Sequence, residues 1–409
     1  MAISSLISYA KTLLVFSLAF ISHAQEVHCR GLSDTPIASA TKIFDVTKYG
    51  AIGDGKTDSA KVFTNVWNEA CKKNADPAKV LVPKGTFLTS PVVFQGPCKS
   101  SNSIIVEVQG TVVATTNLSQ YEDYWFLFEK INGVTLTGGG IFDGQGPKIW
   151  KCKENNDCTK LPSSIKFQSV TNGVISEITS VNSKFFHYHI TECNHFTAKN
   201  LKIIAPDESP NTDGIHISST NRVTVTKSTI RTGDDCISIG DGVTDGTFSE
   251  IFCGPGHGIS IGSLGKYENE DDVNRILVTN CTLSNTQNGV RIKTWGGSPP
   301  SKASGITFED IIMNNVKNPI IIDQNYGDIS KPSQVKVSDI QYKKIRGTSV
   351  SKVAVSLLCS PSVPCEGIEL NDIDLIYADA KLPNSSSVSA SCENAEVTIA
   401  AANLQGCAN

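Results

Sequence analysis

Long apolar runs are nearly absent from the 409-residue sequence. The one pronounced run, LLVFSLAFI at residues 13–21, is shorter than the roughly 20 residues that a membrane-spanning helix needs. It follows Lys11 and precedes Ser22-His23-Ala24, which puts small residues at the two positions that matter for signal cleavage. We therefore expect residues 1–24 to be a secretory signal peptide, and the mature chain to be soluble, extracellular and without a membrane partner.

An excess of charge of one sign is also missing. The chain has 36 Lys and Arg residues against 40 Asp and Glu residues, a formal net charge of -4. Such a balance suggests no nucleic-acid partner, and an acidic ligand would have to be held by a local cluster of charges. Linker-like runs of Pro, Ser or charge are absent too, so we expect residues 25–409 to form a single domain and the protein to be a monomer.

The cysteine count is odd. All 13 cysteines follow the expected cleavage site, which suits an oxidising compartment and leaves at least one thiol unpaired. The short-range candidates for disulfides are Cys152 with Cys158, Cys236 with Cys253, Cys359 with Cys365, and Cys392 with Cys407. The candidate glycan sites in N-x-Ser/Thr triplets are Asn117, Asn280 and Asn384.

Helical periodicity is scarce and occurs once. In SAKVFTNVWNEACKK, residues 59–73, the apolar residues Phe63, Val66 and Trp67 recur at helical spacing. This pattern predicts an amphipathic helix that covers one end of a larger structure. From about Lys79 onward, short β-rich pieces alternate with Gly and Asn.

What the sequence does contain is a repeat. The segments TDGIHI, DDCISI, GHGISI, NGVRI and NPIII share one form. Their first inward-facing residues, with two that continue the series upstream, are Ile165, Tyr188, Ile215, Ile237, Ile259, Val290 and Ile320. A second series of Asn-x-apolar steps runs in parallel at Asn172, Asn194, Asn221 and Asn274. Two or more short strands per period predict an all-β fold, a right-handed parallel β-helix with the N-terminal helix as its cap.

This fold would stack polar residues from different coils, because equivalent positions in successive coils lie about 4.8 Å apart. The positions two residues before the first apolar ones hold Asp213, Asp235, His257 and Asn288. The outward positions after them hold His216, Ser238, Ser260 and Arg291, and Lys293 lies further along the same face. With Asp234, the pattern predicts three carboxylates, an imidazole, a guanidinium and an ammonium on one surface patch.

Clustered carboxylates suit the hydrolysis of a glycosidic bond. Like charges at close range raise the pKa of at least one member, so that one aspartic acid can stay protonated. Such an acid protonates the leaving oxygen while another carboxylate activates water. Arg291 and Lys293 suit a substrate that is itself an acidic sugar.

Four segments carry a resemblance to a known family. SPNTDGIHI (209–217), TGDDCISIG (232–240), CGPGHGISIGSLG (253–265) and VRIKTW (290–295) resemble, in order and spacing, the signature segments of the polygalacturonases, the family 28 glycoside hydrolases. The likeness extends to KYGAIGDGKTD and DQNYGD, and so covers most of the mature chain. The sequence as a whole looks most like those of the plant pollen-type exopolygalacturonases.

The resemblance implies an inverting hydrolase of α-1,4-linked polygalacturonan (pectin) in the cell wall, exo-acting from the non-reducing end and without metal or cofactor. It implies that Asp234 is the general acid, while Asp213 and Asp235 hold and deprotonate the attacking water. The two carboxyl groups of an inverting pair are expected roughly 6.5–9.5 Å apart.

The same resemblance implies roles for the residues around the carboxylates. His257 would tune the proton of the acid, and Arg291 and Lys293 would bind a substrate carboxylate. Asn211 and Tyr326 would line the cleft. One departure is visible at Gly327, where we expect many plant relatives to carry a cysteine, so a disulfide beside Tyr326 is expected to be missing.

Other readings of the same residues stay open. An endo-acting polygalacturonase, or a hydrolase of substituted galacturonan, would share these motifs. A pectate-lyase-like enzyme would need calcium and would form an unsaturated product that absorbs in the ultraviolet. A wall-binding solenoid without catalysis would bind galacturonan and release no reducing ends, although the intact aspartates argue against it.

Metal-binding patterns are incomplete. Asp54 and Asp58 in GDGKTD lack the full ligand spacing of a calcium loop. His187 and His189 alternate like a metal pair, but no cysteine or carboxylate set joins them. We therefore predict no metal.

Overall fold

The computed structural model describes residues 40–154, 158, 161–327, 330–379 and 382–407. The expected signal peptide lies outside these residues. Within them, no helix is both long and apolar enough to cross a membrane.

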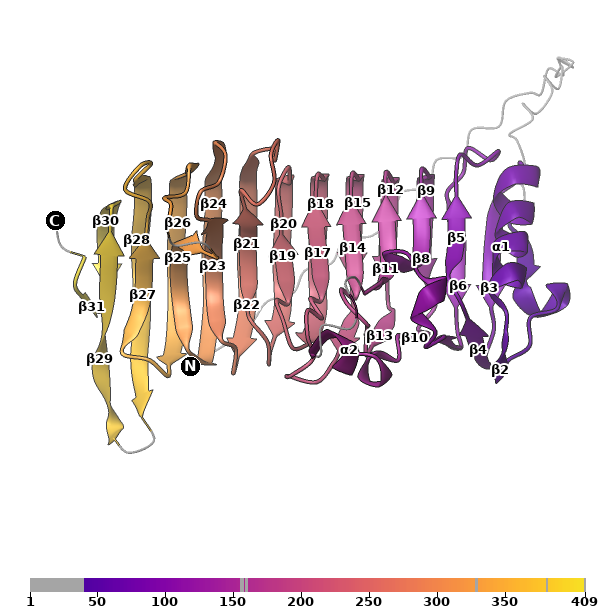
Figure 1. Ribbon diagram of the computed structural model, residues 1–409, viewed down its shortest axis with the longest axis horizontal. Coiled ribbons are helices and arrows are strands. Elements are labelled where there is room, and N and C mark those ends of the chain that lie inside the picture. Colours follow the sequence, from indigo (N-terminus) through magenta and orange to yellow (C-terminus); the bar gives the residue numbers. More distant parts are fainter. Residues whose placement is uncertain (1–39, 155–157, 159–160, 328–329, 380–381, 408–409) are drawn as a thin grey trace, which may run out of the picture. The chain divides into compact units, whose positions relative to one another are not determined.

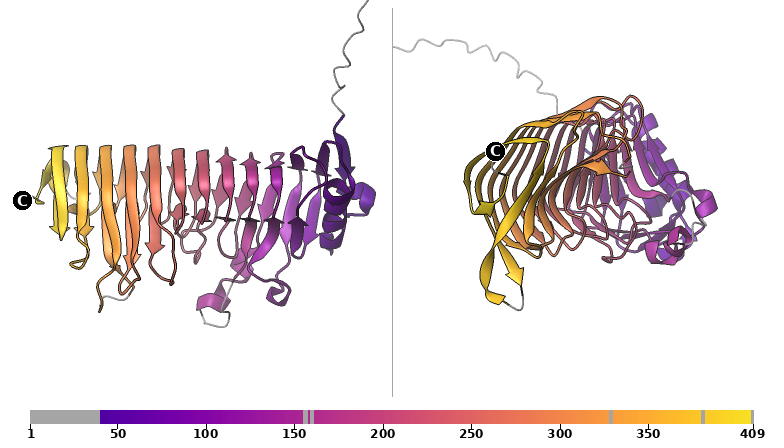
Figure 2. Two further views of the ribbon diagram at one scale, coloured as in Figure 1. Left: turned by 90° about the horizontal axis from the view of Figure 1, so that it is seen from above. Right: turned by 60° about the vertical axis from the view of Figure 1, so that its left-hand side comes forward.

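Successive strands stack side by side in parallel along one axis, which confirms the predicted right-handed parallel β-helix (Figure 1). Figure 2 shows the same stack in two further views, with loops projecting from one edge of the sheets. The first of three sheets contains β5 (Val92–Gln95), β8 (Tyr124–Glu129), β11 (Ser163–Gln168), β14 (Tyr188–Thr191), β17 (Ile215–Ser218), β19 (Ile237–Ile239), β21 (Ile259–Leu264), β23 (Asn288–Trp295), β25 (Asn318–Tyr326), β27 (Val353–Leu358), β29 (Leu382–Glu393) and β31 (Leu404–Gln405).

The second sheet contains β1 (Lys42–Asp45), β3 (Ala78–Val82), β6 (Ile104–Val108), β9 (Asn132–Thr137), β12 (Thr171–Ser176), β15 (Asn194–Lys199), β18 (Asn221–Arg231), β20 (Thr244–Cys253), β22 (Val273–Ser284), β24 (Ser301–Val316), β26 (Val335–Ser349), β28 (Cys365–Asp379) and β30 (Ala395–Ala402). The third contains β2 (Asp54–Asp58), β4 (Thr86–Thr89), β7 (Thr111–Ala114), β10 (Ile141–Asp143), β13 (Thr179–Val181) and β16 (Lys202–Ile204). From β18 onward one long strand continues from the second sheet into the third, because β16 pairs with the second half of β18. Near the C-terminus, β28 also pairs antiparallel with β29.

The predicted repeat sets the register of the first sheet. Ile215 pairs with Tyr188 on one side and with Ile237 on the other, and Ile259 pairs in turn with Val290. All the predicted inward residues of this series are buried. Their alternation with outward residues holds the polar positions of neighbouring coils in line.

The second series was wrong by one residue at its first member. Asn194 pairs with Asn221 as predicted, but the partner of Asn194 in β12 is Thr171 rather than Asn172. Asn172 has a φ of 55°, and it occupies the left-handed corner position that His195 occupies in the next coil, also at 55°. Asn tolerates this conformation better than most residues, which is why it marks a corner here and a strand start elsewhere.

The predicted helix covers the N-terminal end of the stack, at the indigo end of Figure 1. It comprises α1 (Ala60–Asn68) and a π-helical turn, η2 (Glu69–Lys73). Phe63, Val66 and Trp67 are buried, and the Trp67 ring stacks on Phe94 of β5 with a centroid distance of 4.7 Å. The other helical segments are short: η1 (Val46–Tyr49), η3 (Leu118–Gln120), η4 (Gly146–Lys148) and α2 (Lys151–Glu154).

All four predicted disulfides are present: Cys152–Cys158, Cys236–Cys253, Cys359–Cys365 and Cys392–Cys407. A fifth, between Cys71 and Cys98, joins the cap helix to the first coils and was not predicted, since 27 residues separate the two cysteines. Among the described cysteines, Cys193 and Cys281 are free and buried.

Candidate active site

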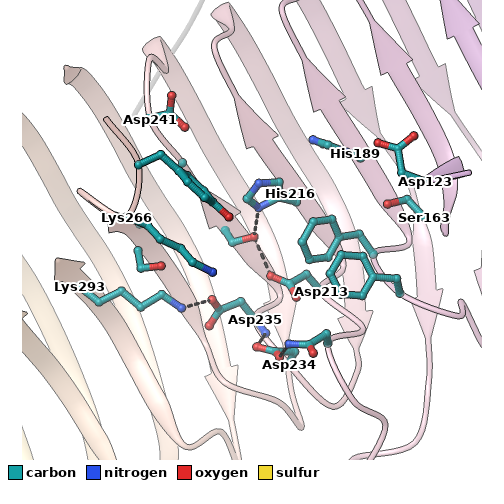
Figure 3. A pocket seen from close by; sticks show the side chains of 18 of the residues that line it. Asp123, Ser163, His189, Asp213, His216, Asp234, Asp235, Asp241, Lys266 and Lys293 are labelled. Atoms are coloured by element: carbon teal, nitrogen blue, oxygen red, sulfur yellow. Dashed lines mark hydrogen bonds and ion pairs between the residues drawn. The ribbon is translucent and has the colours of Figure 1, made fainter. Parts of the chain in front are cut away.

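A cleft of about 600 Å³ lies on the outer face of the first sheet, over β14, β17, β19, β21 and β23. This volume is within the range of sites that hold small ligands. The lining combines aromatic, acidic and basic side chains (Figure 3). Asp213, Asp234, Asp235 and Lys293 contribute to it, as do Asn211 and Tyr326.

Asp235 is the most constrained carboxylate. It lies two residues before the start of the buried strand β19 and is 1% exposed. Its Oδ1 accepts a hydrogen bond of 2.8 Å from Ser260 Oγ, and its Oδ2 accepts one of 2.7 Å from Lys293 Nζ. The guanidinium of Arg291 lies 3.8 Å from the same carboxylate. Both oxygens are therefore held, and the buried negative charge is compensated by two cations.

Asp213 occupies the equivalent position one coil earlier, but among the described residues no cation bonds to it directly. Its Oδ2 accepts a hydrogen bond of 2.7 Å from Ser238 Oγ. Burial, followed by the charges of Asp234 and Asp235, raises the pKa of Asp213 well above its usual range. In the unliganded protein this carboxyl is the one that most readily keeps a proton.

Asp234 faces His257 and Asn211. The His257 Nδ1 lies 3.0 Å from Asp234 Oδ1, and Asn211 Nδ2 donates to Oδ2 at 3.1 Å. Burial acts to raise the pKa of Asp234, but the hydrogen bond and charge of His257 outweigh it and hold this pKa below the usual value. In turn, the hydrogen bond to Asp234 raises the pKa of His257. The two side chains thus compete for one proton, and the opposite directions of their pKa shifts favour its position on His257.

The basic end of the site is covered by aromatic rings. The Tyr326 ring lies 5.8 Å from Arg291 Cζ and 5.5 Å from Lys293 Nζ, and it packs edge-on against Trp295 at 5.3 Å. Gly327 permits this packing, because it has a φ of 77° and a Cβ there would lie 2.1 Å from the Trp295 ring. Within the part of the chain that is described, Arg291 Nε has no hydrogen-bond partner although it is buried. The Nε–H is thus unpaired at a position closed to solvent, while a terminal nitrogen of the same guanidinium faces Asp235 at 3.8 Å.

The structure brings all the predicted site residues together. His257 and Arg291 do not line the cleft, but they contact Asp234 and Asp235 at 3.0 and 3.8 Å. The stacked outward positions also hold, since His216 pairs with Ser238 and Ser260 pairs with Arg291.

Sequence reasoning missed the contributions of the loops. Lining residues that had no predicted role and lie outside the strands include Asp123, Leu161, Phe185, Phe186, Asp241, Lys266, Tyr267 and Glu270. Three more without a predicted role, His189, His216 and Trp295, lie on β14, β17 and β23. Lys266 and Tyr267 directly follow the GSLG motif, and Trp295 is the last residue of VRIKTW. The family motifs therefore adjoin or include these three residues, although no role was predicted for them. No periodic pattern marks the loop residues themselves, because loops lie outside the repeat.

One cluster of possible metal ligands coincides with the site. Ligand atoms of Asp234, Asp235 and His257 lie within 4.8 Å of one another. Lys293 and Arg291 lie within 4 Å of Asp235, so a divalent cation would meet two fixed positive charges there. The same spacing puts one oxygen of Asp234 closer to one oxygen of Asp235 than the 6.5–9.5 Å expected between carboxyl groups of an inverting pair.

Comparison with known families gives one match over most of the chain. The model of glycosyl hydrolases family 28 matches residues 71–401. An exopolygalacturonase from Arabidopsis thaliana is 50% identical over 87% of this chain and 85% of its own length. An exopolygalacturonase from Platanus acerifolia is 43% identical over 88% and 96%, and a polygalacturonase from Gossypium barbadense is 48% identical over 84% and 87%.

Solved structures share the fold at low identity. An exopolygalacturonase from Thermotoga maritima has a TM-score of 0.71 at 18% identity, covering 89% of this chain and 91% of its own. An endo-xylogalacturonan hydrolase from Aspergillus tubingensis has a TM-score of 0.76 at 24% identity, covering 89% and 100%. These likenesses support the β-helix and, at such identities, nothing finer.

Proposed function

The chain belongs to glycosyl hydrolases family 28, and from this premise we propose that it is an exo-acting polygalacturonase that hydrolyses α-1,4-galacturonosyl linkages. The observation that carries the proposal is the cluster of Asp213, Asp234 and Asp235 beside Lys293 and Arg291 in one cleft. Carboxyl groups provide the acid and the base, and the cations bind an acidic sugar. The substrate is a polygalacturonate chain.

Asp234 is proposed as the general acid. Asp234 and His257 share one proton, and only a carboxyl that holds the proton can pass it to the leaving oxygen. A bound galacturonate brings negative charge into the cleft that Asp234 lines and His257 does not, which favours transfer of the proton from His257 to Asp234. His257 therefore stores the proton that the acid delivers.

Asp213 and Asp235 are proposed to hold and deprotonate the attacking water. Asp235 has both oxygens engaged by Ser260 and Lys293, so it is poorly placed to attack an anomeric carbon itself. Asp213 has one oxygen engaged by Ser238 and the other left for water. This division favours direct attack by water, with inversion, over a covalent intermediate.

The remaining site residues bind the sugar. Lys293 and Arg291 hold its carboxylate, with Tyr326 packed over both cations. Asn211 keeps the second oxygen of Asp234 in place. These roles need no metal and no cofactor.

Exo action is favoured by the relatives and by one wall of the cleft. Two relatives at 50% and 43% identity carry the name exopolygalacturonase. Leu161, Cys158 and Phe185 line one side of the cleft, where a small apolar cluster with Ile149 and Trp150 anchors them. A rigid wall there would limit the length of polymer that extends past the carboxylates.

Export to the cell wall as a monomer is part of the proposal. The five disulfides within the described part of the chain fit an oxidising compartment. The apolar run at residues 13–21 fits a cleaved signal peptide. Secretion of the full-length chain, with N-terminal sequencing of the mature product, tests the cleavage after residue 24.

Product analysis on polygalacturonate tests the activity, with Asp234→Asn as the inactive variant and exposed His195→Asn as the matched surface control. We expect galacturonic acid monomer from the first time point with wild type and His195→Asn, and none with Asp234→Asn. A ladder of saturated oligomers would replace exo by endo action. An unsaturated product that disappears on chelation would point to a lyase, and binding without release would point to a wall-binding solenoid.

A further inference from the structure

A hydrogen-bond chain runs from Asp213 away from the other carboxylates. Ser238 Oγ lies 2.7 Å from Asp213 Oδ2 and 2.8 Å from His216 Nδ1. Dashed lines in Figure 3 trace this chain from His216 to Asp213. None of the proposed steps uses His216, although its ring lines the cleft and stacks on Phe186 at a centroid distance of 4.5 Å.

The chemistry of the chain determines where its protons lie. A carboxylate only accepts hydrogen bonds, and the hydroxyl of Ser238 has a single hydrogen. With Asp213 ionised, that hydrogen points to Asp213, so His216 Nδ1 must be the donor to Ser238. A neutral imidazole has one N–H, so Nε2 of His216 is then a bare acceptor.

The His216 imidazole is neutral at pH values above about 4. Burial, and then the charge of Lys293, lowers the pKa of His216 to about 4, while Asp235 acts weakly in the opposite direction. The His189 ring is the other titratable neighbour, at a centroid distance of 5.2 Å. Within the described residues no hydrogen bond reaches Nε2, and this atom is not among the buried atoms that lack a partner.

Protonation of Asp213 reverses the chain. The protonated carboxyl donates to Ser238, the hydroxyl then donates to His216 Nδ1, and Nε2 carries the hydrogen. The hydrogen-bonding character of His216 in the cleft therefore follows the charge of Asp213. The acceptor state of Nε2 coincides with the ionised form of Asp213, which is the form that can activate water.

We propose that His216 is a substrate-binding residue whose Nε2 accepts a hydrogen bond from a hydroxyl group of the bound sugar, and that Ser238 couples this acceptor state to ionised Asp213. The proposal rests on the proposed function, because it adds a binding contact to the same cleft. Its consequence is that the sugar binds in the productive orientation only when the base is ready to act.

Nitrogen-15 NMR of histidine-labelled protein reads the tautomer directly, and His216→Gln assigns the signal. Between pH 4 and 8 we expect His216 to change from the Nε2–H to the Nδ1–H form as Asp213 ionises. Ser238→Ala should abolish this change. Ser260→Ala, which removes the equivalent hydroxyl from Asp235 one coil later, should preserve it. A tautomer that stays Nε2–H throughout, or a change that survives in Ser238→Ala, overturns the coupling.

Two substitutions separate binding from packing. His216→Asn retains a donor near the Nδ1 position and loses the acceptor at Nε2, whereas His216→Gln carries an amide oxygen near Nε2. We expect His216→Asn to lower kcat/KM on polygalacturonate about tenfold or more, mostly through KM, and His216→Gln to lose clearly less. Equal losses would assign His216 a packing role, and an unchanged His216→Asn would exclude the contact.

Failure of this proposal is distinguishable from failure of the proposed function. If wild type does not hydrolyse polygalacturonate, the activity is wrong. The coupling is still decided by the tautomer measurement, and galacturonic acid added as a probe tests the contact. A shift of the His216 Nε2 signal on addition, with the signals of exposed His195 unmoved, supports the contact, and no shift at saturating sugar overturns it.

Discussion

At the scale of single residues, the carboxylate of Asp213 lowers the folding stability of the protein in the ionised form that the proposed reaction needs. Its folded-state pKa is raised by burial and by its acidic neighbours, above the value of about 3.9 for an unfolded chain. The native state therefore keeps a proton that the unfolded state loses, and stability falls as pH rises through that window.

Asp213→Asn should remove this loss. At pH 7 we expect the variant to be more stable than wild type by about 0.5–2 kcal/mol, and near pH 3 we expect equal stability. Its activity should fall at least about 100-fold, because the base is gone. Thermal denaturation at the two pH values, with kinetics alongside, checks both; a variant less stable than wild type at pH 7 would contradict the electrostatic assignment.

His257 should set the alkaline limb of the pH profile. Its pKa is raised by the bond to Asp234, so the shared proton is lost only as pH rises above the usual range of histidine. His257→Asn keeps a neutral donor near Asp234 and cannot store the proton. The alkaline limb of kcat/KM should then move to lower pH by about two units, toward the value of an isolated aspartic acid. His195→Asn is the control, and an unmoved limb would remove His257 from the proton path.

Lys293 compensates the charge of an almost fully buried carboxylate. Lys293→Met leaves Asp235 buried with one oxygen unpaired, which should cost about 3–5 kcal/mol of folding free energy. The double variant Asp235→Asn/Lys293→Met removes both charges and should regain most of this stability while staying inactive. Chemical denaturation of the single and double variants gives the coupling energy. A double variant no more stable than Lys293→Met would show that packing, and not charge, dominates.

At the scale of elements, the loop after β21 carries the cleft residues Lys266 and Tyr267, and the side chain of Glu270 holds the backbone of this loop in place. The carboxylate of Glu270 accepts hydrogen bonds from the backbone N–H groups of Gly265, Lys266 and Tyr267, the last two at 2.9 Å. Lys266 Nζ lies 5.2 Å from the Trp295 ring centroid, on the cleft side of the loop. One carboxylate thus positions both a cation and an exposed aromatic ring.

Glu270→Ala should release this loop. We expect KM for polygalacturonate to rise about tenfold with kcat changed less than about twofold, since the catalytic aspartates are untouched. Trypsin should also cut after Lys266 faster than in wild type. Exposed Glu268, in the same loop, provides the control as Glu268→Ala. Equal effects of the two substitutions would exclude the anchor.

Strands could be predicted from the sequence and loops could not. The pairing of Ile215 with Ile237 could be predicted because each coil repeats the same alternation of buried and exposed residues. Asn172 misled the second series because Asn suits both a strand start and a left-handed corner. Phe186 and Lys266 were missed because they lie on loops whose lengths differ between coils.

At the scale of the molecule, the stack itself builds the site. Asp213, Asp235 and Lys293 come from separate coils and meet because the first sheet holds their coils in register. The cluster could therefore be predicted once the period was found. The proton assignment could not, because it depends on burial and on the contact between His257 and Asp234.

This dependence on register gives a last prediction. In a solenoid each coil contacts only its neighbours, so a packing defect acts mainly where it occurs. Ile239 is buried in the coil that carries Asp235, and Ile340 is equally buried in β26, on another sheet and several coils further along. Ile239→Ala and Ile340→Ala should each lower the free energy of unfolding by about 2–5 kcal/mol.

Only Ile239→Ala should lower kcat at a temperature where both variants are folded, by at least about tenfold, because it shifts the strand that positions Asp235. Denaturation curves and kinetics on polygalacturonate measured side by side give the comparison. If Ile340→Ala lost as much activity at equal stability, the geometry of the ladder would depend on the whole stack rather than on neighbouring coils. In that case a defect anywhere along the solenoid would reach the carboxylates.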